Sequence, residues 1–140
     1  MSGTDGIIRD ETGTQRTLGY VLDVSRGDGR ARCTLTLDDR HTNRHGMLHG
    51  GLAAVMLDNA MGATGSLSVD PSGLHPMLTL SLTTNFLSSG RVGDTLTAEG
   101  WITGGGRKTK FIDGRLTAED GRVVATATGV FKPMPTGSKT

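Results

Sequence analysis

Residues 50–67 (GGLAAVMLDNAMGATGSL) are the one long stretch of this chain with the pattern of a helix. The segments around it have the alternation of strands: residues 18–24 and 31–38 before it, and residues 77–88, 94–103, 107–118 and 122–132 after it. The breaks SGRVGD, GGG and EDG are rich in turn residues. Because helices do not alternate with strands, this order argues against a Rossmann-type fold. It predicts an α+β domain in which the helix covers one face of an antiparallel sheet of about six strands.

The 140 residues suffice for one domain with its own hydrophobic core. We expect this domain to span residues 17–133. The N-terminal extension (1–16) and the C-terminal tail (134–140) are polar and rich in Gly, Ser and Thr, so we expect both to be frayed. Residues 18–24 and 31–38 should pair as a hairpin. Cys33 then falls on its apolar face and is interpreted as a small core residue, not a catalytic thiol.

Charge and composition restrict the partners. The net charge of +1 gives no reason to expect nucleic acid or a membrane bound through bulk charge. The first residues have no apolar signal-peptide segment, and no run approaches the roughly 20 apolar residues of a membrane helix. A single cysteine fits a reducing cytoplasm, where we expect the protein. The four histidines have no cysteine partners at metal-ligand spacing, so we expect no metal site.

Asp58 is the one carboxylate in the helical segment, and positions 54, 55, 61 and 62 offer no Lys or Arg to pair with it. The face expected to pack on the sheet carries Leu52, Val55, Met56 and Ala60. Asp58 lies on a different stripe, made of Gly51, Ala54, Gly62 and Gly65. Small residues let a ligand or another backbone approach closely. On geometry alone, Asp58 is either a functional acid or a solvated residue at the edge of a loosely packed helix.

The helix begins at His49-Gly50-Gly51, where unpaired N–H groups and the positive dipole end suit a developing oxyanion. Asp58 lies about 12 Å further along the helix than Gly50. One helix therefore cannot bring both groups to the same atom. Two antiparallel copies of the helix could set Asp58 of one beside Gly50 of the other, so the sequence predicts a composite site in a homodimer.

Residues 43–62 follow the pattern N-x-x-G-x-x-H-G-G-x-x-A-x-x-x-D-x-A-x-G. This segment resembles the PaaI-like (phenylacetate-degradation type) hotdog-fold acyl-CoA thioesterases, and strand order extends the resemblance more weakly over residues 17–133. The resemblance implies a long central helix wrapped by a curved antiparallel sheet. It also implies homodimers that can pair into tetramers, and hydrolysis of an acyl- or aryl-CoA to free acid and CoA.

Carried over residue by residue, the resemblance assigns roles to five positions. The Gly50 N–H would polarise the thioester carbonyl, helped by Asn43 and His49. Asp58 of the other subunit would activate the attacking water or attack directly, and Thr79 would help to hold that water. Coenzyme A would be part of the substrate and not a resident cofactor. The residues expected to bind it are Ser88, Ser89, Arg91, Gly106, Arg107, Lys108, Thr109 and Lys132.

Several alternatives stay open at this point. The GGGRKT segment could be only a hairpin turn with solvated basic neighbours. The chain could be a non-catalytic acyl-CoA sensor or a hydratase/dehydratase, because fold similarity alone does not decide function. A sensor would be expected to lack the acid or to carry a DNA-binding segment, and a hydratase to place a His differently. The acyl group, aliphatic or aryl, is also open.

Overall fold

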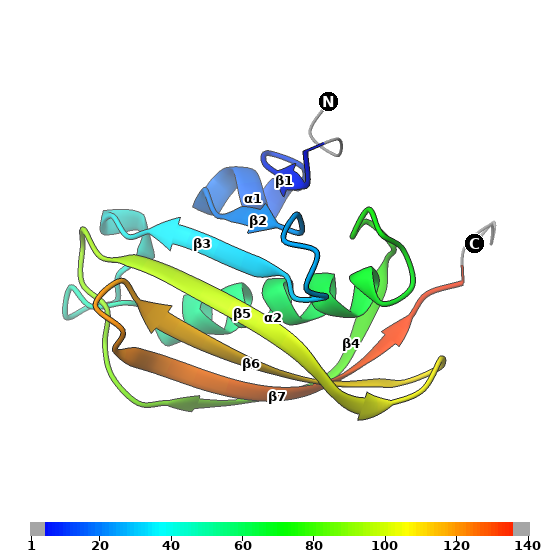
Figure 1. Cartoon of the computed structure of the whole chain (residues 1–140). Coiled ribbons are helices and arrows are strands. Elements are labelled where there is room, and N and C mark those ends of the chain that lie inside the picture. The colour runs from blue at the N-terminus through cyan, green and yellow to red at the C-terminus, as the bar shows by residue number, and fades with distance from the viewer. Residues whose placement is uncertain (1–4, 136–140) are drawn as a thin grey trace.

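The computed structural model describes residues 5–135. One long helix, α2 (Gly50–Leu67), lies against a single antiparallel sheet that curves around it (Figure 1). The strands are β1 (Ile7–Ile8), β2 (Val21–Asp23), β3 (Arg32–Thr36), β4 (Met77–Phe86), β5 (Thr95–Gly105), β6 (Lys110–Ala118) and β7 (Val123–Pro133). Their order is β1-β2-β3-β5-β6-β7-β4. The expected α+β architecture of the hotdog fold is confirmed, with seven strands where about six were predicted.

Helix α2 has the bounds that the sequence predicted. The predicted packing face is only partly right: Leu52, Met56 and Ala60 are buried, but Val55 is only half-buried. The buried face is wider than one stripe, because the curved sheet touches the helix on several sides. It also includes Ala53, Leu57, Met61, Ala63 and Thr64.

Two glycines allow the sheet to curve so tightly over α2. A Cβ on Gly100 of β5 would lie 2.7 Å from the Thr64 hydroxyl and 3.0 Å from the Ala60 carbonyl oxygen. A Cβ on Gly114 of β6 would lie 2.7 Å from the sulfur of Met61. Real Cβ atoms do not approach so closely, so these positions exclude larger residues. The central strands therefore rest almost directly on the helix.

The described part of the N-terminal extension is ordered, so the expectation of a frayed segment is wrong for residues 5–16. Ile8 is buried and pairs with Leu22 of β2. Helix α1 (Gly13–Leu18) buries Gln15, whose side-chain amide donates to the carbonyls of Ile8 and Tyr20 and accepts from the Glu11 N–H. One amide thus satisfies three backbone groups and fastens the segment to the sheet. Residues 1–4 and 136–140 of the predicted ends lie outside the described residues, and the domain limits at 17 and 133 stay a prediction.

The predicted hairpin is confirmed, since β2 and β3 pair antiparallel. Strand β2 begins at Val21 and not at residue 18, because α1 ends there with Gly19 in the left-handed region (φ 87°). Cys33 is fully buried on β3, as expected of a core residue, and burial raises the pKa of its thiol. In the described part of the chain no helix is both long and apolar enough to cross a membrane.

Candidate active site

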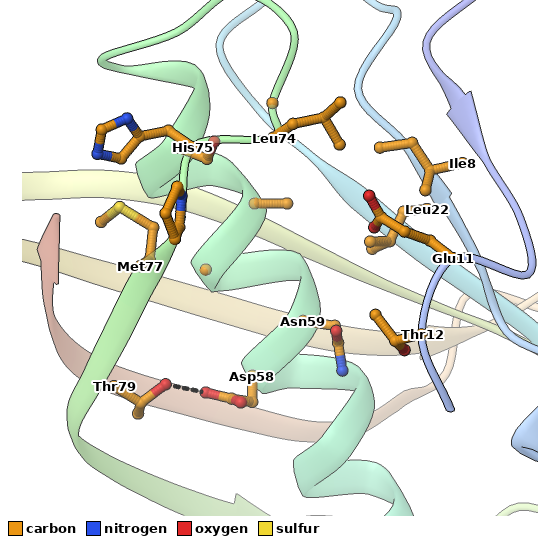
Figure 2. A pocket seen from close by; sticks show the side chains of 15 residues that line it. Ile8, Glu11, Thr12, Leu22, Asp58, Asn59, Leu74, His75, Met77 and Thr79 are labelled. Carbon is orange, nitrogen blue, oxygen red and sulfur yellow. Dashed lines mark hydrogen bonds between the residues drawn. The ribbon is translucent and has the colours of Figure 1, made fainter. Parts of the chain in front are cut away.

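Asp58 of α2 and Thr79 of β4 face each other across the gap between the helix and the edge strand (Figure 2). The Thr79 hydroxyl donates a hydrogen bond of 2.7 Å to Oδ1 of Asp58. Both side chains remain accessible to solvent, and Asp58 makes no ion pair within residues 5–135. The hydrogen bond to Oδ1 therefore fixes the orientation of the Asp58 carboxylate. Its other oxygen, Oδ2, is available to a ligand or to a second chain.

Two hollows meet at this pair, because Asp58 and Thr79 line both. One is a groove of about 300 Å³ between α2 and β4 that extends toward the helix start past Gly51, Ala54 and Leu82. The other is a pocket of about 310 Å³ that extends toward the helix end. At Gly51 and Ala54, the predicted stripe of small residues thus forms part of an open surface. At Gly65 it does not: a Cβ there would lie 2.7 Å from the Met77 side chain.

The start of α2 presents one free backbone donor. His49 is the N-cap, and its Nδ1 accepts from the Gly51 N–H at 2.9 Å. The Gly50 N–H donates to no acceptor within residues 5–135. Gly50 also lies beside the Phe86 ring, since an added Cβ would be 3.4 Å from it. An N–H at the positive end of an 18-residue helix, next to an open surface, suits an oxyanion.

Asn43 lies beside this helix start, because an antiparallel bridge joins Thr42 to Leu48. Its side-chain oxygen accepts from the N–H groups of His45 and Met47, which closes the loop before the helix. The two N–H groups of its side-chain amide have no acceptor in the described part of the chain. The structure therefore gives His49 a capping contact and leaves Asn43 donors available.

The single chain brings only some of the expected site residues together. Asp58 and Thr79 are in contact, whereas Gly50 lies about two helical turns away, roughly 12 Å along the axis. His49 and Asn43 lie at the same end of the helix as Gly50. No atom of a substrate can touch the Gly50 N–H and the Asp58 carboxylate of the same chain at once.

The expected CoA-binding residues lie at opposite ends of the sheet. Ser88, Ser89 and Arg91 line a pocket of about 360 Å³ near the start of α2, where Met47 bridges to Arg91. Lys132 pairs with Leu78 at the other end of β4. The turn between β5 and β6 lies at that same end, and the Gly106 N–H bonds to the Thr109 carbonyl to close it. This segment is a hairpin turn with Arg107 and Lys108 at its exposed tip. A contact of these residues with CoA stays a prediction.

Arg122 is a site candidate that the sequence analysis missed. Its guanidinium donates to the carboxylates of Asp120 and Asp94 and to the carbonyl of Ser89. It therefore shapes the pocket that Ser88, Ser89 and Arg91 line. Arg122 follows the EDG turn, and the sequence pattern places it only at the start of the strand expected at residues 122–132. No local pattern indicates a contact with a residue 33 positions away.

Known proteins share this architecture and the central segment. The thioesterase superfamily profile matches residues 45–125, which is more than half of the chain and includes α2 and β4. The chain belongs to the thioesterase superfamily. The expected class of enzyme, a thioester hydrolase, is thereby confirmed.

Two curated relatives of this thioesterase cover most of its length. It is 35% identical over 97 residues to a Pseudomonas aeruginosa protein named as an esterase, across 69% of this chain and 70% of that protein. It is 28% identical over 112 residues to human acyl-coenzyme A thioesterase 13, across 79% of this chain and 78% of the human protein.

Two solved structures share the fold of this thioesterase at 25% identity. The Escherichia coli PaaI protein from the phenylacetic acid degradation operon matches with a TM-score of 0.78 over 89% of this chain and 86% of that one. A Bacillus halodurans protein solved with CoA matches with a TM-score of 0.80 over 92% and 83%. The PaaI-like resemblance and the hotdog fold that it implied are confirmed.

Proposed function

We propose that this thioesterase hydrolyses acyl-CoA thioesters. Water adds to the thioester carbonyl carbon, the carbon–sulfur bond breaks, and the products are the free acid and the CoA thiol. The observation that carries the proposal is the Asp58 carboxylate, held by Thr79 and free of any cation within residues 5–135. Relatives named as acyl-CoA thioesterase or solved with CoA support CoA as the thiol part of the substrate.

In this proposal Asp58 accepts the proton of the attacking water through Oδ2. Thr79 occupies Oδ1, so it fixes the plane of the carboxylate and leaves one oxygen to act as base. The carbonyl oxygen becomes an oxyanion as water adds and is stabilised by the partner subunit's Gly50 N–H, with Asn43 as a second donor. His49 holds the helix start in place. Direct attack by Asp58 is the alternative route to the same products.

The exposed edge strand supports a homodimer. Strand β4 pairs with β7 on one side only. Its apolar side chains Leu78, Leu80 and Phe86, and Leu87 directly after it, are 46–61% exposed. A ten-residue edge of this kind favours pairing with another strand. A second copy pairs with it antiparallel, so that β4 continues into the β4 of the partner.

This pairing explains why the site needs two chains. Thr79, with Asp58, lies near one end of β4, and Phe86, with Gly50, lies near the other. In an antiparallel pair centred near Leu82, Thr79 of one chain lies opposite Phe86 of its partner. Asp58 of one chain then lies near the start of the partner's α2. The start of α2 in its own chain is too far away to share a substrate atom with it. We further expect dimers to pair into tetramers, and the protein to act in the cytoplasm.

The same pairing would assemble a CoA site. It brings the start of β4, where Lys132 of β7 pairs with Leu78, and the hairpin tip at residues 106–109 to the end of the partner's β4. Ser88, Ser89 and Arg91 follow that end of the strand. Cations from both subunits, with the hydroxyls and backbone N–H groups between them, can then contact the CoA phosphates.

A panel of acyl- and aryl-CoA thioesters, assayed by detection of the released thiol, tests the proposal. At least one should be hydrolysed, and Asp58→Ala should lower kcat at least about a hundredfold, the usual loss for a positioned base. A sensor module would bind acyl-CoA without turnover. Hydrolysis that Asp58→Ala leaves unchanged would refute the assignment of Asp58.

A further inference from the structure

The second half of α2 carries a buried hydroxyl that has no partner. Ser66 is 1% exposed, and its Oγ is the one buried side-chain oxygen or nitrogen in residues 5–135 that makes no hydrogen bond. Buried hydroxyls are nearly always hydrogen-bonded, because water would otherwise solvate them in the unfolded chain. Ser66 lines the pocket that begins at Asp58 and Thr79. An unpartnered donor and acceptor beside a pocket suggests that its partner is a ligand.

The pocket has the length of a short acyl group. Asp58 and Ser66 are eight residues apart on α2, which separates them by about 12 Å along the axis. Between them the helix offers Asn59, Gly62 and Ala63 to the pocket, so the part of its floor next to Ser66 is made of small residues. Part of this length is taken by the attacking water and the reach of the two side chains. The remainder suits an acyl chain of about six carbons.

The opposite wall of the pocket is the ordered N-terminal segment, which contributes Ile8, Glu11 and Thr12. Figure 2 shows the Glu11 carboxylate directed from this segment toward α2. The backbone of Glu11 is held in place, because its N–H donates to the buried Gln15 side chain at 3.0 Å. The Tyr20 hydroxyl, 3.3 Å from Oδ1 of Asn59, links the same region to the helix. The backbone of this wall is thus preorganised, and the Glu11 side chain extends from it as an exposed group.

We infer that this pocket binds the acyl group and selects one that carries a neutral hydroxyl at its far end, with Ser66 and Glu11 as the residues that select it. The inference rests on the proposed acyl-CoA hydrolysis. A terminal hydroxyl can accept a hydrogen bond from Ser66 and donate one to Glu11. A terminal methyl leaves the Ser66 hydroxyl unpartnered, and a terminal carboxylate meets the like charge of Glu11.

Three CoA thioesters of equal chain length test this selection: hexanoyl-, 6-hydroxyhexanoyl- and hexanedioyl-CoA. The wild-type kcat/KM should be highest for the hydroxylated thioester, about tenfold above hexanoyl-CoA, and lowest for the diacid. Ser66→Ala should lower the ratio of hydroxylated to plain substrate about tenfold. Glu11→Gln should raise the ratio of diacid to plain substrate by a similar factor. Ser68→Ala is the matched control, because its hydroxyl donates to the Gly65 carbonyl and lies outside the pocket.

Thermal unfolding of the same variants separates a ligand role from a structural one. Ser66→Ala should keep or raise Tm, because it removes an unpartnered buried hydroxyl. A lower Tm with an unchanged substrate ratio would mean that Ser66 serves the fold, and the inference would be overturned. Equal hydrolysis of the three thioesters, or an unchanged diacid ratio in the surface variant Glu11→Gln, would overturn it too, while acyl-CoA hydrolysis itself would stand. Failure to hydrolyse any CoA thioester would instead remove the proposed function and the inference with it.

Discussion

The Thr79 hydroxyl of the edge strand β4 donates a 2.7 Å hydrogen bond to the Asp58 carboxylate of α2. The contact joins residues 21 positions apart, at the place where the groove and the pocket between these elements meet. It orients one carboxylate oxygen and leaves the other available to a water molecule. The proposed chemistry depends on this orientation as well as on the acid itself.

Removing the Thr79 hydroxyl should therefore slow turnover. Thr79→Val, which keeps the shape of the side chain, should lower kcat about tenfold with a smaller effect on KM, because it removes a hydrogen bond to a charged group. Thr79→Ser keeps a hydroxyl and should restore most of kcat. Steady-state kinetics on one good substrate measure both variants, and a fully active Thr79→Val would contradict the orienting role.

The exposed hairpin tip should contribute to substrate binding through charge. The double variant Arg107→Ala/Lys108→Ala should raise KM more than it changes kcat, because phosphate contacts are equal in the ground and transition states. The difference from wild type should shrink as salt increases. Arg26→Ala is a suitable control, since this exposed cation pairs with Asp23 at the β2–β3 hairpin. If KM of the double variant matches wild type at low salt, the CoA phosphates bind elsewhere.

Cys33 should be chemically silent in the folded protein. Burial raises the pKa of this thiol above its ordinary value of 9.0, so the neutral form is favoured in the fold. Its contribution to stability is then complete below pH 9 and falls as pH rises above that value, because the unfolded thiol ionises first. Aromatic disulfide reagents at pH 8 should react with Cys33 only after denaturant is added. Rapid reaction with the native protein would contradict its burial. Cys33→Ala should remove this part of the loss of stability above pH 9.

The close approach of β5 to α2 should make Gly100 sensitive to substitution. Gly100→Ala places a Cβ 2.7 Å from the Thr64 hydroxyl and 3.0 Å from the Ala60 carbonyl oxygen, so it should lower the free energy of unfolding by about 1–3 kcal/mol. Gly104→Ala on the same strand serves as the control. Its added Cβ would have Phe111 as its one near neighbour, at 3.4 Å, which is an ordinary contact distance. Denaturant titration compares the two, and equal stability of both variants would contradict the tight packing.

The sequence was most informative where one long element decided the arrangement. The bounds of α2 could be predicted because His49-Gly50-Gly51 mark its start and no comparable apolar run competes with it. The family resemblance assigned Thr79 to the attacking water, but its hydrogen bond to Asp58 was not predicted, because nothing local relates a helix residue to a strand residue 21 positions later.

Short elements and long-range contacts could not be predicted in this way. Strand β1 has two residues and α1 has six, too few for any periodicity, and both depend on the buried side chain of Gln15. Val55 was expected to pack on the sheet, but it lines the groove with Leu82, because the direction of the edge strand is a tertiary property. The contact of Arg122 with Ser89 is tertiary in the same sense.

The shared site is the central claim, and two inactive variants can test it. Asp58→Ala removes the acid. Gly50→Pro removes the N–H at the first helical position, where proline is well tolerated, and the extended backbone of His49 (φ −69°, ψ 128°) suits a following proline. Gly50→Ala is the matched control, because it keeps the N–H and its Cβ makes only ordinary contact with Phe86.

The most direct measurement is hydrolysis after subunit exchange between the Asp58→Ala and Gly50→Pro proteins. Random exchange makes about half of the dimers heterodimers, each with one site whose two parts are intact, so activity should return to about a quarter of the wild-type value. Mixtures of either variant with itself should stay inactive. Folded and demonstrably exchanged heterodimers that remain inactive would contradict a site shared between two chains.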